Sequence, residues 1–316
     1  MNGFTFVAFT YNQEKYIIQH LESIRYQIEN FGKDTDCYFL LCDDCSTDKT
    51  VYLCKKWIAE YKNLFKDVNF IIQDKNRGIV NNYLTALSNI NTTKFKILAG
   101  DDLYFKNNIF DFNNEYNFVI TPVLNFDNNS NITEMDMCYY NMFLHKQSQN
   151  ADLKSFISKY LKYTNVIYAP GAFYNRVYDI NKAIDALKNY KFIEDYPFWN
   201  YLFSISNLRL FVETKPLILY RCDVGISTNT KHPKRAEFLK YEKRLEEEIK
   251  TDCSLPKLIN PYRYRHKYYC FMSKYFYSKS SYVKKSNENI DKEINSAQKY
   301  LNEIINKANL WMKGNL

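Results

Sequence analysis

Two adjacent carboxylates, Asp101 and Asp102, directly follow a short, largely apolar run, 96–99, and a glycine. Apolar residues bounded by a glycine are typical of a buried strand that ends in a loop. In open α/β sheets, ligands bind just beyond the carboxyl ends of the strands. Carboxylate oxygens suit Mg²⁺ or Mn²⁺, whose remaining ligands are commonly phosphate oxygens. Asp101 and Asp102 are therefore predicted metal ligands, with a surface Gly-Asp-Asp turn as the alternative.

Two earlier apolar runs also end in short polar loops. Their residues are Thr10, Tyr11, Asn12, Asp43 and Asp44. Parallel strands place their carboxyl ends at one edge of a sheet, so these groups are expected to converge with Asp101 on a nucleotide site. Asn12 is also a candidate N-cap of the helix that follows, as are Ser46 and Asp48 for the next helix.

Strand-like and helix-like segments alternate four times in about the first hundred residues. The predicted strands are 4–9, 37–42, 68–72 and 95–98, and a turn is expected at 76–78. Alternation of this kind predicts a doubly wound, mostly parallel sheet flanked by helices, an α/β fold.

The ordered set of loops resembles the inverting glycosyltransferases of family 2, which have the GT-A fold. The matching stretches are 6–12, 43–50, 76–78 and 98–102, and the second carries the specific pattern Asp-Asp-x-Ser-x-Asp-x-Thr. The resemblance implies a nucleotide-binding set of Thr10, Tyr11, Asn12, Asp43, Asp44, Arg77, Gly78 and Asp101. It also implies that Asp102, with Asp101, holds a divalent cation that bridges the diphosphate. The family often shows Leu-Asp-x-Asp-Asp, and Ala99 replaces the first aspartate here.

Two later segments extend the resemblance. Residues 168–173, including Gly171, resemble the segment beneath the sugar and acceptor, and 192–199 resemble the family's Glu-Asp motif. Inversion requires a carboxylate that removes the acceptor hydroxyl proton, and the resemblance assigns this role to Asp195, with Glu194 as its helper. The alternative for this pair is an acidic first turn favoured by a helix dipole.

The segment 217–227 resembles the strand and loop that close the catalytic domain. Arg221, Lys231 and His232 are candidates for diphosphate or acceptor binding, with solvated basic residues as the alternative. The expected GT-A catalytic domain spans about 1–230, with a nucleotide-binding half to about 105 and an acceptor half from 106 to 230. A helical C-terminal region is expected over 231–316.

An apolar stripe with alternating steps of four and three runs through this C-terminal region. Its residues are Ile290, Ile294, Ala297, Leu301, Ile304, Ala308 and Trp311. The spacing predicts packing on a neighbouring helix of the region or on a second subunit, which would give a homodimer. The segment 262–285 mixes aromatic and basic residues, as in an interfacial membrane contact or a bundle helix with solvated lysines.

Composition sets broad limits. The chain has 316 residues and a formal charge of +8, which favours anionic partners without choosing among them. It shows neither an apolar run of membrane-spanning length nor a secretory signal, so a cytoplasmic location is expected, with peripheral attachment to the inner face of the membrane as an extension. The eight cysteines are scattered, which fits reduced thiols.

Three rival functions remain open on the sequence. Cys37, Cys42 and Cys45 have the C-x4-C-x2-C spacing of plant-type ferredoxins. A nucleotidyltransferase would use a similar sheet and metal and release pyrophosphate. A nucleic-acid-binding protein would use the basic, aromatic C-terminal segment, although acidic residues interrupt its charge.

The favoured function is that of a metal-dependent, inverting glycosyltransferase with Mn²⁺ or Mg²⁺ as cofactor. Its expected donor is a nucleoside diphosphate sugar, UDP-sugar in the first place. Its expected acceptor is a hydroxyl of a growing surface glycan, free or lipid-linked, and no nucleic-acid partner is expected.

Overall fold

The computed structural model describes most of the chain between Gly3 and Asn315. The undescribed residues are 1–2, 112–114, 133–151, 162–164, 166, 176–177, 223, 228, 251–280 and 316.

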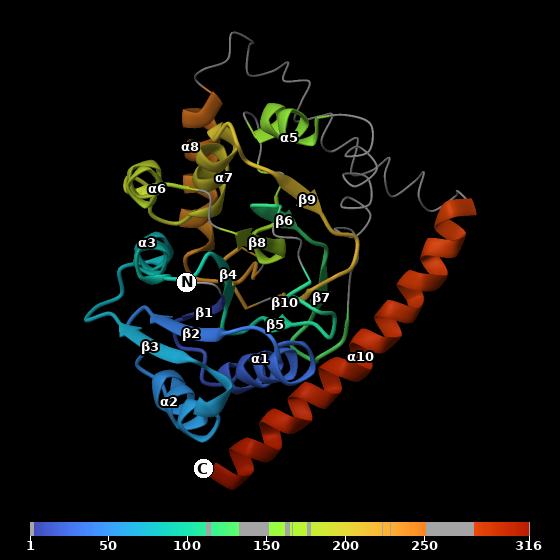
Figure 1. Ribbon diagram of the computed structural model, residues 1–316. Coiled ribbons are helices and arrows are strands. Elements are labelled where there is room, and N and C mark those ends of the chain that lie inside the picture. The colour runs from blue at the N-terminus through green and yellow to red at the C-terminus, as the bar shows by residue number, and fades with distance from the viewer. Residues whose placement is uncertain are drawn as a thin grey trace.

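A seven-stranded sheet forms the centre of the molecule (Figure 1), with strand order β3-β2-β1-β4-β8-β6-β9. Its strands are β1 (Phe4–Thr10), β2 (Cys37–Asp43), β3 (Asp67–Ile72), β4 (Lys94–Ala99), β6 (Phe118–Ile120), β8 (Ala172–Asn175) and β9 (Leu210–Val212). Strands β3, β2, β1 and β4 are parallel, whereas β8 is antiparallel to both of its neighbours. The predicted mostly parallel sheet is confirmed.

A second, three-stranded sheet lies beside the first. Its strands are β5 (Leu103–Tyr104), β10 (Ile218–Arg221) and β7 (Val123–Phe126). The central strand β10 pairs with β5, which directly follows the two carboxylates at the end of β4. This pairing brings Arg221 to the loop that carries Asp101 and Asp102.

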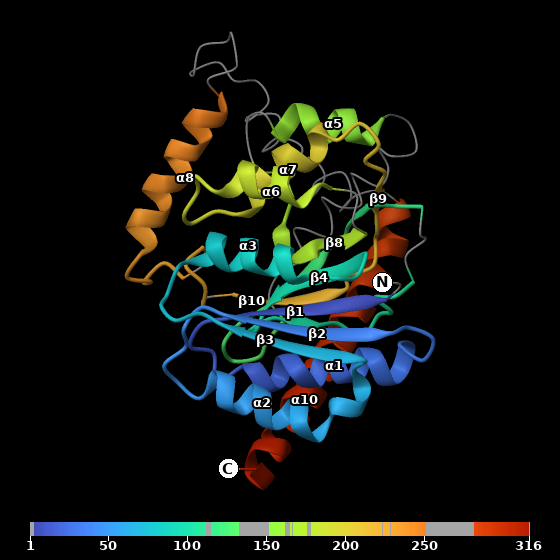
Figure 2. The ribbon, with the colours of Figure 1, turned by 60° about the vertical axis from the view of Figure 1, so that its left-hand side comes forward.

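Helices cover both faces of the main sheet. They are α1 (Ile17–Phe31), α2 (Thr50–Glu60), α3 (Ile79–Asn89), α5 (Leu153–Leu161), α6 (Ile180–Leu187), α7 (Asp195–Ser204), α8 (Arg235–Lys250) and α10 (Ser281–Asn315), with 3-10 turns η1 (Lys62–Leu64) and η2 (Ala169–Gly171). Figure 2 shows α1 and α2 on one face and α3, α6 and α7 on the other.

The beginnings of α1 and α2 differ from the expected ones. Helix α1 begins only at Ile17, after Tyr16, so Asn12 is not its N-cap. The N-cap position of α2 belongs to Lys49 rather than to Ser46 or Asp48. The Asp48 carboxylate nevertheless accepts a hydrogen bond from the backbone N–H of Thr50, the first residue of α2, at 2.9 Å.

Strand β1 is buried over its whole length, as predicted, and its side chains enter two separate cores. The same alternation applies to β2, where Cys42 lies in the core beside α3 and Cys37 in the core beside α1 and α2. The two thiols lie on opposite faces of the sheet, so they do not ligate one iron–sulfur cluster. Burial also raises the pKa of both thiols to about 12.

The C-terminal helix α10 crosses the outside of the molecule alongside α1 (Figures 1 and 2). The predicted apolar stripe is buried from Ala297 to Trp311, and the Tyr300 hydroxyl donates to the Tyr104 carbonyl oxygen at 2.8 Å. Its partners are α1, the three-stranded sheet and α2, so the expected packing on a neighbouring helix of the C-terminal region was wrong. From Ala297 to Trp311 the stripe is therefore used within the chain, and the homodimer stays a prediction.

In the described residues, no helix combines the length and the apolar character needed to cross a membrane. Most of the segment 262–285, for which a membrane contact was considered, lies outside the described residues.

Replacing Trp311 by Ala should strongly destabilise the protein. The indole is 7% exposed, packs against the core beside α1, and donates from Nε1 to the Glu60 carboxylate at 2.7 Å. Loss of a buried tryptophan typically costs about 3–5 kcal/mol. Urea unfolding measures the change, and Leu310→Ala is the matched control because Leu310 is 70% exposed on the same helix turn. Equal stability of the two variants would contradict the packing of α10 described above.

Candidate active site

The carboxyl ends of β2, β1 and β4 bring three predicted site segments side by side. The backbone N–H of Asp44 donates to the Thr10 carbonyl oxygen at 2.9 Å, and that of Gly100 donates to the Phe9 carbonyl oxygen at 2.7 Å. The convergence predicted from the parallel-strand rule is therefore confirmed in the backbone.

The first two loops are tied together by their own polar side chains. The buried Asp43 carboxylate accepts from the Thr10 hydroxyl and from the Ser46 hydroxyl, each at 2.6 Å. Asn12, with a φ of 53°, accepts from the Thr47 backbone N–H at 2.8 Å through its side-chain oxygen. Asp43 and Asn12 thus build the loops, whereas Tyr11, 48% exposed, presents its ring to solvent beside them.

Asp44 holds the predicted turn at Arg77 and Gly78. Its two carboxylate oxygens accept from the backbone N–H groups of these residues at 2.7 and 2.9 Å. Gly78 has a φ of 85°, a conformation that glycine adopts without strain. The Arg77 guanidinium instead pairs with the exposed Asp74 carboxylate at 2.8 Å, so the structure places the Arg77 backbone, and not its charge, against Asp44.

Asp101 and Asp102 are almost completely buried, at 6% and 2% exposure. One oxygen of Asp101 accepts from the Gln13 side-chain amide at 2.9 Å, and one oxygen of Asp102 accepts from the Arg221 backbone N–H at 2.9 Å. Burial raises the pKa of both carboxyls, and the charge of Asp101 raises that of Asp102 further. Two like charges withdrawn from water in this way favour a nearby cation.

The donor set of this pair fits a small divalent cation. Within the described residues, no third acidic, histidine or cysteine side chain completes a metal cluster with them. The residue three positions before Asp102 is Ala99, which supplies no ligand. Mg²⁺ and Mn²⁺ tolerate such a sparse protein set because water and substrate phosphate complete their shell.

The Arg221 side chain stabilises the loop that carries Asp101 and Asp102. Its guanidinium donates from Nε to the Asp101 carbonyl oxygen at 3.0 Å and from Nη2 to the Gln19 side chain at 2.7 Å. It also lies 4.3 Å from the ring centres of both Tyr16 and Phe126. The predicted residue is thus brought to the site, but its described hydrogen bonds fix the protein itself.

Gln13 and His20 are site residues that the sequence analysis missed. His20 is fully buried, its Nδ1 lies 2.7 Å from the Asp102 carbonyl oxygen, and burial lowers its pKa to about 4. A neutral imidazole must carry its proton on Nδ1 to donate there. Helical spacing placed His20 on the apolar face of the first helix but gave no sign of its contact with the Asp102 loop, and no motif marked Gln13.

Asp195 is the first residue of α7, as both the family resemblance and the helix-dipole alternative require. Its carboxylate is partly exposed and accepts from the Asn165 side-chain amide at 2.9 Å and from the Tyr196 backbone N–H at 2.7 Å. Burial raises the pKa of Asp195 to about 6. Burial, together with the charge of Asp195, raises the pKa of Glu194 to about 8. Because its pKa is the lower of the two, Asp195 is ionised near neutral pH and can accept a proton there, whereas Glu194 is mostly protonated.

One segment connects Asp195 with the carboxylate loop. At its start Asn165 contacts Asp195, and further on the Tyr168 ring lies 5.2 Å from that of Tyr220, the neighbour of Arg221 in β10. The segment ends in η2, where the backbone N–H of Thr121 donates to the Gly171 carbonyl oxygen at 2.8 Å. A Cβ atom at Gly171 would overlap the Thr121 carbonyl oxygen, so glycine is required here by close backbone approach.

Lys231 and His232 are not brought to the carboxylates by any described contact. They lie in the loop before α8, where their described hydrogen bonds are local: the Lys231 N–H donates to the Asn229 side chain at 2.9 Å, and His232 accepts from the Lys234 N–H at 3.1 Å. Their assignment to the diphosphate stays a prediction.

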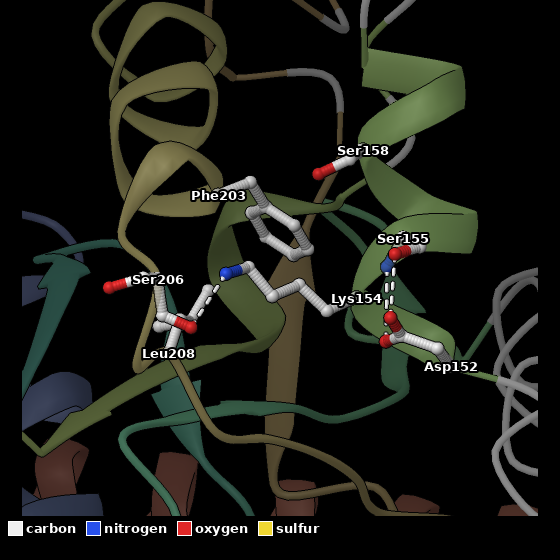
Figure 3. Close-up of a pocket in the computed structure, with 7 residues that line it drawn as sticks. All are labelled: Asp152, Lys154, Ser155, Ser158, Phe203, Ser206 and Leu208. Carbon is white, nitrogen blue, oxygen red and sulfur yellow. Dashed lines mark hydrogen bonds between the residues drawn. The ribbon is translucent and has the colours of Figure 1, made fainter.

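A polar hollow of about 590 Å³ lies at the end of α7 opposite to Asp195 (Figure 3). Within it Lys154 of α5 donates to the Ser206 carbonyl oxygen at 3.1 Å, and the Asp152 carboxylate accepts from the Ser155 hydroxyl at 2.6 Å. Both charged side chains of the hollow thus already have hydrogen-bond partners within it. The hollow lies between α5 and the end of α7, and its lining includes none of the predicted site residues.

The main sheet and its flanking helices have the GT-A fold, and comparison with known proteins agrees. The model described as Glycosyl transferase family 2 matches residues 5–155, just under half of the chain, which confirms the family resemblance over this part. The structure of S. aureus TarS in complex with UDP-GlcNAc has a TM-score of 0.52 at 18% identity and covers 81% of this chain and 68% of that one.

One further solved structure shares the fold, and one further protein is similar in sequence. The mannosyltransferase PcManGT from Pyrobaculum calidifontis, in complex with GDP-Man and Mn²⁺, has a TM-score of 0.50 at 16% identity over 99% of this chain and 88% of that one. A teichoic acid poly(glycerol phosphate) polymerase of Staphylococcus epidermidis is 33% identical over 102 residues. This match covers 32% of the present chain and only 13% of the polymerase.

Asp102→Asn is expected to stabilise the protein in EDTA. The pKa of Asp102 is raised in the folded state, so its ionisation opposes folding, and stability is lost as the pH rises from the unfolded-state pKa toward the folded-state value. The neutral amide removes this cost, so Tm should rise by roughly 2–4 °C, the shift that a change of about 1 kcal/mol typically produces in a domain of this size class. Thermal unfolding at pH 7 measures it, with the exposed Asp111→Asn as control.

Mn²⁺ is expected to stabilise the wild type, and the same variant should lose this effect because its amide is a poorer ligand for a divalent cation. A metal-free Asp102→Asn protein that melts below the wild type would contradict the electrostatic account of this pair.

Gly171→Ala should destabilise the protein, because the added methyl group overlaps the Thr121 carbonyl oxygen. Overpacking of this kind typically costs about 1–3 kcal/mol. Gly314→Ala is the matched control with the opposite sign, since nothing lies within 4 Å of its Cβ and alanine favours the helix there. Chemical denaturation of both variants measures the difference, and a neutral Gly171→Ala would show that η2 does not need its close approach.

Proposed function

We propose that this protein is a metal-dependent, inverting glycosyltransferase that moves a sugar from a nucleoside diphosphate donor to a hydroxyl of a growing surface glycan. The observation that carries the proposal is the meeting of three polar loops at one sheet edge. Two buried carboxylates lie at this edge, and Asp195, a base with a raised pKa, contacts Asn165, which lies three residues before Tyr168, a neighbour of Tyr220 in β10. The family match over residues 5–155 supports the same reaction class.

The proposed donor is a nucleotide sugar, with UDP favoured over other nucleotides. TarS is described with UDP-GlcNAc and PcManGT with GDP-Man and Mn²⁺, and both share the fold. Thr10, Tyr11 and Asn12 and the turn at Asp44, Arg77 and Gly78 would surround the nucleoside. Asp101 and Asp102 would hold Mn²⁺ or Mg²⁺, which when bound supplies positive charge to the leaving diphosphate.

The chain's own residues account for the proton transfer. Asp195 takes the proton of the acceptor hydroxyl as that oxygen forms a bond to the anomeric carbon on the face opposite the leaving group. The bond from the anomeric carbon to the phosphate oxygen breaks, and the nucleoside diphosphate departs with the electron pair. Asn165 orients the Asp195 carboxylate, and the charge of Asp195 adds to burial in raising the pKa of Glu194 beside it.

The acceptor and the cellular location are further parts of the proposal. The teichoic acid polymerase relative favours a cell-surface polymer as acceptor, although the matched stretch is a small part of that protein. A cytoplasmic enzyme attached peripherally to the inner face of the membrane would meet such an acceptor on a lipid carrier. Arg221, Lys231 and His232 would line the approach to the diphosphate.

Thermal-shift measurements against UDP, GDP and dTDP, with and without Mn²⁺, test donor binding first. Ligand stabilisation grows with concentration over the dissociation constant, so the preferred base should give the largest shift. Incubation with the matching sugar nucleotides should then release nucleoside diphosphate. Release of pyrophosphate would favour the nucleotidyltransferase instead, and no shift with any nucleotide would overturn the proposal.

Asp195→Asn should fold normally and lose transfer by about 10²–10⁴-fold, the usual contribution of a positioned base. For the wild type, kcat/KM should fall as the pH drops through about 6, because the base must be ionised and burial raises its pKa to about 6. Asp185→Asn, on the exposed surface of α6, is the control. Transfer by Asp195→Asn at the wild-type rate would remove Asp195 as the base.

A further inference from the structure

Lys96 is a fully buried lysine that the proposed chemistry does not use. It lies in β4, five residues before Asp101, and is 0% exposed. Its ammonium donates to the carbonyl oxygens of Ala172 at 2.9 Å and Ala169 at 3.3 Å, and it lies 5.2 Å from the centre of the Phe173 ring. Among the described residues, no carboxylate forms an ion pair with it.

Burying an ammonium without an ion-pair partner is costly, so its presence requires a compensating interaction. The two carbonyl groups provide it, and a charged donor makes stronger hydrogen bonds than a neutral one. In agreement, burial lowers the pKa of Lys96 to about 7, while the nearby charge of Asp102 opposes this shift. A leucine or methionine would occupy the same strand position without this cost.

The two carbonyl groups belong to the first residue of η2, Ala169, and to the residue that directly follows the turn, Ala172. Lys96 holds the turn from the β4 side, and the Thr121 backbone holds it from the other side through Gly171. The same segment contacts Asp195 through Asn165 and Tyr220 through Tyr168. Movement of η2 would therefore change the position of the base relative to the metal-binding edge.

We propose that Lys96 is a positioning residue that fixes η2 against β4 and thereby sets the placement of the base Asp195 relative to Asp101 and Asp102. Its structural part stands on the hydrogen bonds alone, whereas its catalytic consequence rests on the proposed function. The ammonium itself touches the protein backbone and makes no contact with the reacting groups.

Amide hydrogen exchange of the full-length protein without ligand tests the structural part. In Lys96→Met, the amides of residues 167–169 and of Gly171 should exchange at least about tenfold faster than in the wild type, because methionine fills the volume but donates no hydrogen bond. Lys94→Met, on the same strand but partly exposed, should leave this exchange unchanged. Unchanged exchange in folded Lys96→Met would overturn the proposal. If Lys96→Met does not fold, Lys96→Gln, one atom shorter than lysine, decides by the same criterion.

Kinetics with UDP and Mn²⁺ as the binding probes test the catalytic part. Lys96→Met should bind UDP–Mn²⁺ within about threefold of the wild type but lose about 10²-fold in kcat, the loss typical of a misplacement of about 1 Å. Equal kcat would overturn the catalytic part. If the wild type shows no transfer with any sugar nucleotide, the proposed function fails, and the exchange result still decides the role of Lys96 in holding η2.

Discussion

Two neighbouring carboxylates are buried at the end of β4, and their mutual repulsion away from water is the constraint on which the rest of the site depends. Asp101 and Asp102 are held by an amide and a backbone N–H, and the positive charges of Arg221 and Lys96 act on Asp102 without forming an ion pair with it. Such a pair is electrostatically costly in the absence of a cation. The structure retains this cost at a place where a divalent ion and a diphosphate would relieve it, a common compromise between stability and function.

The loops around this pair are stiffened by bonds among themselves. Asp43, Asn12 and Ser46 join the loops after β1 and β2, and Asp44 holds the turn before α3. Many of the residues by which the chain resembles family 2 thus form hydrogen bonds that make this edge of the sheet rigid. A rigid edge places its exposed groups for a ligand without paying for loop ordering when the ligand binds.

The far end of the chain also stabilises this edge. Helix α10 covers α1 and the small sheet, so residues around position 300 pack onto the elements that carry His20 and Arg221. The helix and the site are thereby coupled through shared packing, although the two carboxylates at the end of β4 lie far from α10 in sequence. The expectation of a separately packed C-terminal region did not anticipate this arrangement.

The sequence by itself determined the parallel sheet, the meeting of Thr10, Asp44 and Asp101 at one edge, and the position of Asp195 at a helix start. These features follow from local periodicity and from one topological rule, both of which are present in the order of residues. Only the tertiary structure decided the roles of Gln13, His20, Lys96 and Asn165, and the surface on which α10 packs. An apolar stripe or a lone polar side chain shows that a packing or hydrogen-bond partner is needed. Which residue becomes that partner depends on which distant segments the fold brings together.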